Sequence, residues 1–393
     1  MRIIFISAYR LISGYGGGIF LSRAYFEAIR TIFKSKKIIL IGSEEDEKIC
    51  DGTLDIEYVS IKKANIIKKI RLVLFNKAID RMSPETENWL KKYLNKDDMV
   101  IINGAPIGRL SKLVYDLNNK NIIVIHHNIE KDFFKDNYFK NINFLFRKKI
   151  EKIIESNQII GYKYASINIF LTERDMNKCR ELYGESKGQS VVAPVFLPPD
   201  LSSCPEMQDI DFRIRRNILI TGSLNIHQMK EPFMRFIREE LPIIRNELSN
   251  IKIILAGYRP DKILKLFCKR NEIELIDNPI SMDEIFKIAD IYISITEGGS
   301  GKKIKIIEAL KWGLPIIAHR SSLIGYEEIL NKNLIFQYEN IKEIRNSLHK
   351  LIEKEKISKN ERQEIQEYFK KTYAFESGTL KFENMFHFIY NKL

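Results

Sequence analysis

The sequence of 393 residues has no long apolar run and no paired cysteines. No run approaches the roughly 18–20 apolar residues of a bilayer-spanning helix, which excludes an integral membrane protein built on such helices. The apolar run at residues 3–8 is too short for the core of a secretory signal, and we expect it to be the first strand. The four cysteines lie far apart without C-x-x-C spacing, so they indicate a reducing compartment and neither a zinc nor a redox site; they are Cys50, Cys179, Cys204 and Cys268.

Acidic residues are also fewer than basic ones. The chain has 51 Asp plus Glu against 64 Lys plus Arg, which gives a net charge of +13 and implies an anionic partner. Nucleic acid, anionic lipid and a phosphorylated substrate would all fit this charge. No helix-turn-helix, RNA-binding or finger motif accompanies it, so we expect no nucleic acid among the partners.

What the sequence does contain is a regular alternation of β-branched apolar runs with amphipathic stretches, such as 19–33 and 144–160. This rhythm indicates β-α-β units and mostly parallel sheets. The strands expected in the first half are residues 2–8, 37–41, 55–61, 99–102, 122–125, 166–171 and 190–195. Those expected in the second half are residues 217–221, 251–256, 274–276, 291–295 and 315–318. From about residue 341 the pattern is helical, and no further strand is expected.

Between the two halves, prolines, serines and acids replace this alternation and predict a linker. We therefore expect an α/β protein with two Rossmann-like, doubly wound domains that face a cleft. The predicted parts are a first domain at 1–197, a linker at 198–212, a second domain at 213–375 and a C-terminal helix at 376–393.

The strongest chemical signal follows the strand at 291–295, where a glycine-rich turn opens a helix. Backbone amides at a helix start bind phosphate well, because they are unpaired and lie at the positive end of the helix dipole. Lys303 and Lys305 add positive charge there, and Glu308, about one turn further on, can accept hydrogen bonds from sugar hydroxyls. A solvated loop with a basic first turn is the alternative, although lysines at a helix start are unfavourable without an anion.

The run Gly301-x-Lys303-x-Lys305-x-x-Glu308-Ala309, followed by Gly313-x-Pro315, resembles the nucleotide-sugar signature of the group 1 family of retaining glycosyltransferases. The resemblance covers residues 217–330 well and the first domain more loosely. It implies the glycosyltransferase-B fold, with an acceptor-binding first domain, a donor-binding second domain and C-terminal helices that cross back to pack on the first domain. It also implies transfer from a nucleotide-diphosphate sugar with retention of anomeric configuration. It also implies no cofactor and no metal. The family pattern has a second glutamate eight residues before the first, where this chain has Ser300, with Glu297 as the nearest acid.

The resemblance also implies roles for individual residues. Lys303 and Lys305 would stabilise the departing diphosphate, and Glu308 would bind the ribose of the donor. The loop after the second domain's first strand would complete the donor site, with Lys230 as a further cation or a plain surface lysine. The donor-binding set is Gly222, Ser223, Lys230, Ser300, Gly301 and Glu308.

Two motifs in the first domain complete the candidate site. The glycine-rich segment with Gly16, Gly17 and Gly18 follows the first strand, where it is either a structural turn or, as in the family, a loop that faces the cleft. The adjacent pair His126 and His127 does not indicate a metal, because neighbouring strand residues point to opposite faces. His127-Asn128-x-Glu130 resembles a family motif, which implies that His127 reaches the transferred sugar and that Asn128 and Glu130 serve the acceptor side; a structural histidine is the alternative.

Two basic, apolar segments of the first domain, 62–77 and 141–149, are typical of helices that lie on an anionic membrane surface. The alternative is that each packs its apolar face on the sheet. We expect a bacterial glycosyltransferase with a glycan or lipid-linked acceptor of surface polysaccharide, in the cytoplasm on the inner face of the membrane. A sugar-nucleotide epimerase or hydrolase and a non-catalytic glycan-binding relative remain as alternatives.

Overall fold

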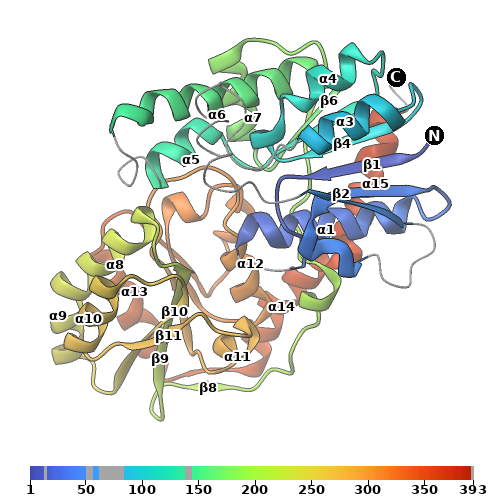
Figure 1. Cartoon of the computed structure of the whole chain (residues 1–393). Helices are drawn as coiled ribbons and strands as arrows, with labels where there is room; N and C mark the ends of the chain where they lie inside the picture. The colour runs from blue at the N-terminus through green and yellow to red at the C-terminus, as the bar shows by residue number, and fades with distance from the viewer. Residues whose placement is uncertain (13–15, 50–55, 62–83, 138–143, 391–393) are drawn as a thin grey trace. The chain divides into compact units, whose positions relative to one another are not determined.

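The chain folds into two units in the computed structural model, each around its own parallel β-sheet (Figure 1). Unit 1 contains Met1–Pro198 and Gly378–Leu393, and unit 2 contains Pro199–Ser377. The structure describes residues 1–12, 16–49, 56–61, 84–137 and 144–390. Among these residues, no helix is both long enough and apolar enough to cross a bilayer. The predicted α/β class with two parallel sheets is confirmed.

Unit 1 contains a seven-stranded parallel sheet in the order β3-β2-β1-β4-β5-β6-β7. Its strands are β1 (Ile3–Ser7), β2 (Ile38–Ser43), β3 (Ile56–Ile61), β4 (Met99–Asn103), β5 (Ile122–His126), β6 (Ile167–Phe170) and β7 (Gln189–Val192). Every residue of β1, β4, β5 and β6 is buried, as expected for parallel strands with both faces covered. Each of the seven overlaps a predicted apolar run.

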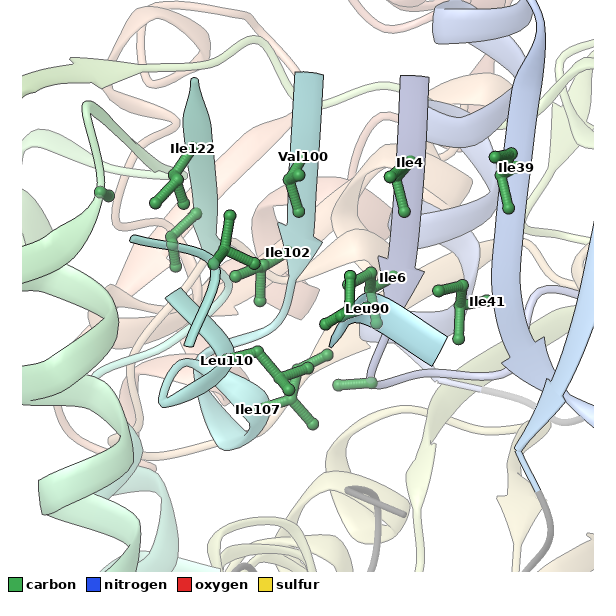
Figure 2. Close-up of a cluster of buried hydrophobic side chains, with 14 residues drawn as sticks. Ile4, Ile6, Ile39, Ile41, Leu90, Val100, Ile102, Ile107, Leu110 and Ile122 are labelled. Carbon is green, nitrogen blue, oxygen red and sulfur yellow. The ribbon is translucent and has the colours of Figure 1, made fainter. Parts of the chain in front are cut away.

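The helices of unit 1 cover this sheet. They are α1 (Gly17–Ile32), α3 (Pro84–Tyr93), α4 (Leu110–Asp116), α5 (Glu130–Asn137), α6 (Phe144–Tyr164), α7 (Glu173–Tyr183) and most of α15 (Phe375–Tyr390). On one face, side chains of β1, β2, β4 and β5 pack with Leu90 of α3 and Leu110 of α4, and Figure 2 shows this cluster. Such alternation of Ile, Val and Leu between strand and helix fills the interior at high density.

The last helix, α15, supplies aromatic side chains to unit 1. Phe382 stacks on Tyr25 of α1 with ring centroids 4.8 Å apart, and Phe386 meets Phe33 edge-on at 5.7 Å. Residues at the two ends of the chain therefore share one core, which a local sequence pattern cannot reveal.

Unit 2 contains a six-stranded parallel sheet in the order β11-β10-β9-β12-β13-β14. Its strands are β9 (Arg216–Ser223), β10 (Ile251–Tyr258), β11 (Glu274–Asp277), β12 (Ile291–Ser294), β13 (Ile316–His319) and β14 (Ile335–Tyr338). The helices are α8 (His227–Glu239), α9 (Leu241–Glu247), α10 (Lys262–Arg270), α11 (Met282–Lys287), α12 (Ile304–Lys311), α13 (Glu343–Ile352) and α14 (Lys359–Thr372). A short antiparallel pair, β8 (Ile210–Asp211) with β15 (Lys356–Ile357), lies outside the main sheet.

The structure corrects the sequence analysis at two places in unit 2. The strand β14 was not predicted; only two of its four residues are buried, and it is identified by its pairing with β13. The expectation of purely helical structure after residue 341 is wrong at β15, which pairs with β8. The segment expected as a linker belongs to unit 2, and its Met207, Ile210 and Phe212 are buried.

The packing of α15 on unit 1 generates a stability prediction. A Cβ atom at Gly378 would lie 2.1 Å from the ring of Phe196, closer than any real contact. We expect Gly378→Ala to lower the free energy of unfolding by roughly 1–3 kcal/mol through overpacking, although alanine favours a helix. Leu380→Ala on the same helix, at a side chain 58% exposed, is the matched control and should change little. Thermal unfolding measures both; a stabilised Gly378→Ala protein would contradict this packing.

Candidate active site

The candidate site of unit 2 lies where the sheet changes direction. From β9 the chain first adds β10 and β11 on one side, and then β12, β13 and β14 on the other. The carboxyl ends of β9 and β12 are therefore neighbours, and the helices that follow them diverge (Figure 1). Such a switch point leaves a crevice in which doubly wound sheets bind ligands.

A glycine-rich turn at residues 297–301 leads from β12 to α12. Gly298, Gly299 and Gly301 have φ angles of 76°, 86° and 71°, a region that side chains disfavour. A Cβ atom at Gly299 would lie 2.9 Å from the Lys303 amine and 2.8 Å from Oε1 of Gln228. The turn therefore needs glycine, and it brings bare backbone close to two polar side chains. Its Ser300 is buried.

The two predicted lysines stand at the start of α12. Lys303 is the N-cap residue, and its amine donates to the carbonyl of Ser300 at 2.9 Å. The Lys305 amine donates to Oγ1 of Thr296 and, at 3.4 Å, to the carbonyl of Thr221 at the end of β9. Among the described residues, Lys305 forms no ion pair with a carboxylate. Burial, together with the neighbouring charge of Lys303, lowers the pKa of Lys305 to about 7.

Gly222 allows the close approach of Lys305 to β9. A Cβ atom at Gly222 would lie 3.7 Å from the Lys305 amine and 3.0 Å from the Met229 side chain. Ser223, the last residue of β9, is half-buried at the same edge. The structure thus brings together Gly222, Ser223, Lys305 and the glycine-rich turn.

Glu308 lies one helical turn beyond Lys305. Its side chain forms no hydrogen bond or ion pair with the described part of the chain, so its oxygens can accept bonds from a ligand. Burial raises the pKa of Glu308 to about 7, with Lys311 opposing the shift and Asp283 adding to it. The neighbouring Lys311 is engaged elsewhere, in an ion pair of 2.5 Å with Asp283.

Lys230 lies on α8, where its amine forms an ion pair of 2.5 Å with Asp261. The same carboxylate caps α10 by accepting from the amide of Leu264 at 2.8 Å. Lys230 therefore serves a contact between two helices in this structure, as an alternative to the diphosphate role that we expected.

Gln228 is a candidate that the sequence analysis missed. It lies in the first turn of α8, and its backbone carbonyl accepts a hydrogen bond from the backbone amide of Glu297 at 3.1 Å. Its Nε2 is buried without a hydrogen-bond partner among the described residues, beside Gly298 and Gly299. The only signal for Gln228 in the sequence was the start of a helix after the first predicted strand of the second domain. Lys230 was chosen as the phosphate ligand in that helix because it is charged.

The second group of predicted residues lies at the corresponding edge of unit 1, where β1 and β4 are neighbours. His127 follows β5 and is buried, and its Nε2 lies 2.8 Å from Oδ1 of Asn103. The Tyr9 ring packs on the His127 ring, with the two ring centroids 4.7 Å apart. Burial, with the adjacent His126, lowers the pKa of His127 to about 3. His126 instead stacks on Phe170. The two rings therefore have separate surroundings.

The loop after β5 is held by one residue of α6. Gln158 donates from Nε2 to the carbonyl of Asn128 at 2.8 Å and accepts from the amide of Glu130 at 3.0 Å. Glu130 is the first residue of α5 and is buried. The sequence analysis missed Gln158 and Asn103, because neither belongs to a local motif.

The glycines at the start of α1 lie at the same edge of unit 1. Gly16 is the N-cap residue of α1 with φ 146°, and Gly17 begins the helix. A Cβ atom at Gly18 would lie 3.1 Å from the Tyr9 ring. Gly18 therefore lets α1 begin close to the aromatic ring that packs on His127.

Residues 215–354 match the family model described as Glycosyl transferases group 1. No curated protein is similar enough in sequence to match.

Solved structures share the fold over the whole chain at low sequence identity. Sucrose-phosphate synthase from Thermosynechococcus elongatus is 11% identical with a TM-score of 0.69, covering 100% of both chains. WaaG, a glycosyltransferase involved in lipopolysaccharide biosynthesis, is 12% identical with a TM-score of 0.66 and covers 98% of this chain and 99% of its own. An E. coli structure described as trehalose-6-phosphate bound with UDP-2-fluoro glucose is 11% identical with a TM-score of 0.64, covering 100% of this chain and 99% of that chain.

The lowered pKa of Lys305 generates a test of the phosphate site. A bound pyrophosphate should raise the pKa of Lys305 from about 7, so binding at pH 8 takes up protons. We expect the wild-type protein to take up more protons than Lys305→Met, by at most one, when calorimetry is performed in two buffers of different ionisation enthalpy. Equal proton uptake by the two proteins would remove Lys305 from the site, and failure of both to bind would remove the site.

Proposed function

Because residues 215–354 match the family model described as Glycosyl transferases group 1, we propose that this enzyme transfers a sugar from a nucleotide-diphosphate donor to a hydroxyl of a glycan or lipid-linked acceptor. One observation carries the proposal: Lys303 and Lys305 meet a glycine-rich turn at the start of α12, at the switch point of the sheet. Cations and a helix start that converge in this way fit a diphosphate.

The reaction explains why charge is gathered there. The bond between the anomeric carbon and the diphosphate oxygen breaks, so positive charge grows on the sugar and negative charge on the departing nucleoside diphosphate. The acceptor oxygen bonds to the anomeric carbon and loses its proton to solvent or to the departing phosphate. Lys303, Lys305 and the dipole of α12 stabilise the leaving group, which is where electrostatic catalysis acts most strongly.

The remaining residues orient the donor. Glu308 accepts hydrogen bonds from the ribose hydroxyls, and Gly222, Ser223, Ser300 and Gly301 lie along the diphosphate. The Gln228 amide donates to a phosphate oxygen beside Gly299, a partner that its buried Nε2 otherwise lacks. In unit 1, His127 contacts the transferred sugar, and Asn128 and Glu130 serve the acceptor side.

We further propose retention of anomeric configuration, in keeping with the family that the motif resembles. The chain then acts without a metal or a cofactor, since Lys303 and Lys305 supply the positive charge at the leaving group.

The finer role that we propose is synthesis of bacterial surface polysaccharide in the cytoplasm, on the inner face of the membrane. The fold shared with WaaG supports this association. The basic segment 62–77 lies outside the described residues. Of segment 141–149, the structure describes the start of α6, where Phe146 is 45% exposed and Lys148 is exposed. An exposed aromatic beside lysines suits an anionic lipid surface.

Substitutions in unit 2 test the site. We expect Lys303→Ala and Glu308→Ala each to reduce transfer at least about 100-fold, because leaving-group stabilisation or donor orientation is lost. Their melting temperatures should stay near the wild-type value. Lys350→Ala, at an exposed lysine of α13, is the matched control and should retain activity. Near-wild-type turnover of the first two variants would refute the site.

The assay is release of nucleoside diphosphate, after a thermal-shift screen of UDP, GDP, CMP and their sugars has identified the donor. Release that an added acceptor accelerates supports transfer. Release at the same rate with and without acceptor would instead favour a hydrolase, and no release with any donor would favour a glycan-binding protein.

Liposome flotation tests the membrane proposal. We expect the protein to float with vesicles that contain anionic lipid and to be released by salt, because surface electrostatics are screened. Vesicles of neutral lipid are the control. Equal recovery with both kinds of vesicle, or none with either, would remove membrane association.

A further inference from the structure

Three polar side chains form a hydrogen-bonded chain at the carboxyl edge of unit 1. Ser7 and Asn103 are the last residues of β1 and β4 and lie opposite each other in the register of these strands. Nδ2 of Asn103 donates to Oγ of Ser7 at 3.1 Å, and Oδ1 of Asn103 meets Nε2 of His127 at 2.8 Å. The imidazole of His127 is thus held by Asn103 of β4, which is in turn held by Ser7 of the neighbouring strand β1.

The hydrogen bonds of Ser7 determine which atom donates and which accepts in each bond between Ser7, Asn103 and His127. Its single hydroxyl hydrogen goes to the carbonyl of Tyr9 at 2.6 Å, and its oxygen accepts from the amide of Tyr9 at 3.2 Å. Ser7 can therefore only accept from Asn103, which turns Nδ2 toward Ser7 and Oδ1 toward His127. An oxygen has no hydrogen to give, so Nε2 of His127 carries the proton.

The other ring nitrogen is consequently a bare acceptor. Nδ1 of His127 is buried and has no hydrogen-bond partner in the part of the chain that the structure describes. Burial keeps the pKa of His127 near 3, so the ring is neutral at pH 7. The titratable neighbours are His126 before it, Tyr9 against its ring and Glu130 at the start of α5. A buried acceptor normally has a donor, and a ligand hydroxyl can provide one.

We propose that Ser7 and Asn103 are positioning residues that lock His127 as the Nε2–H tautomer, so that Nδ1 accepts a hydrogen bond from a sugar hydroxyl. This inference rests on the proposed function for the identity of the ligand. It rests on the hydrogen bonds alone for the tautomer.

Unit 1 contains a matched control in His126. Its Nε2 meets Oδ1 of Asn168 at 2.9 Å, and Nδ2 of Asn168 donates to the carbonyl of Tyr162 at 3.0 Å and to Ser186 at 3.1 Å. The same lock therefore holds a histidine whose Nδ1 is also buried without a partner among the described residues, but whose ring stacks on Phe170 and takes no part in the proposed reaction.

The tautomer can be observed in the free protein. With ¹⁵N-labelled histidine, the His127 resonances, assigned by their loss in His127→Gln, should show a protonated Nε2 and an unprotonated Nδ1 from pH 6 to 9. Ser7→Ala should give a mixture of the two tautomers, because the Asn103 amide can then rotate. An Nδ1–H ring or an imidazolium in the wild-type protein would overturn the lock, whether or not sugar transfer is detected.

Asn103→Asp tests the consequence for turnover. A carboxylate at this position still accepts from Nε2 but stabilises the imidazolium, which raises the pKa of His127 and places a proton on Nδ1. Relative to the wild-type protein, kcat/KM should be about tenfold lower at pH 6, as expected for one lost hydrogen bond, and should recover toward pH 9. Asn168→Asp should show no such trend. A pH-independent ratio for Asn103→Asp would overturn the proposal.

The two substrates that bear hydroxyls are distinguished by measuring donor hydrolysis without acceptor as well as transfer. A deficit in both reactions assigns the hydroxyl to the donor sugar, and a deficit in transfer alone assigns it to the acceptor. Absence of both reactions in the wild-type protein would refute the proposed function instead, and the resonances of His127 would still test the lock.

Discussion

The chemistry of unit 2 depends on an unfavourable electrostatic arrangement. Lys303 and Lys305 bring like charges together at the start of α12, where the helix dipole is also positive. Burial makes the charge of Lys305 still less favourable, and no carboxylate of the described residues pairs with it. The diphosphate of the proposed donor would relieve these costs together, because it would neutralise both lysines and accept hydrogen bonds at the helix start.

Unit 1 has a different set of buried polar groups at the corresponding edge of its sheet. His126 and His127 are neutral, and each is held by an asparagine, so neutral amides stand where unit 2 has cations. Neutral acceptors with fixed orientation suit hydroxyl groups, whose hydrogen bonds depend on direction more than on charge.

Patterns predicted most of the fold, since buried parallel strands such as β1 and β5 consist mostly of β-branched residues. Patterns did not predict β14. Only two of its four residues are buried, and it forms a strand by pairing with β13. Lys303, Lys305 and Glu308 could be proposed because a glycine-rich helix start has a recognisable spacing. Gln228 and Asn103 could not, because a single amide side chain has no pattern of its own.

The sequence by itself determined the two parallel sheets, the position of the glycine-rich turn and the charge at the start of α12, because each follows from neighbouring residues. Only the tertiary structure decided which polar groups meet. It paired Lys230 with Asp261, placed Gln228 beside Gly299, and linked Ser7, Asn103 and His127 across adjacent strands. Hydrogen bonds act over about 3 Å, and residues 96 positions apart in the chain, such as Ser7 and Asn103, reach that distance only when the sheet has formed.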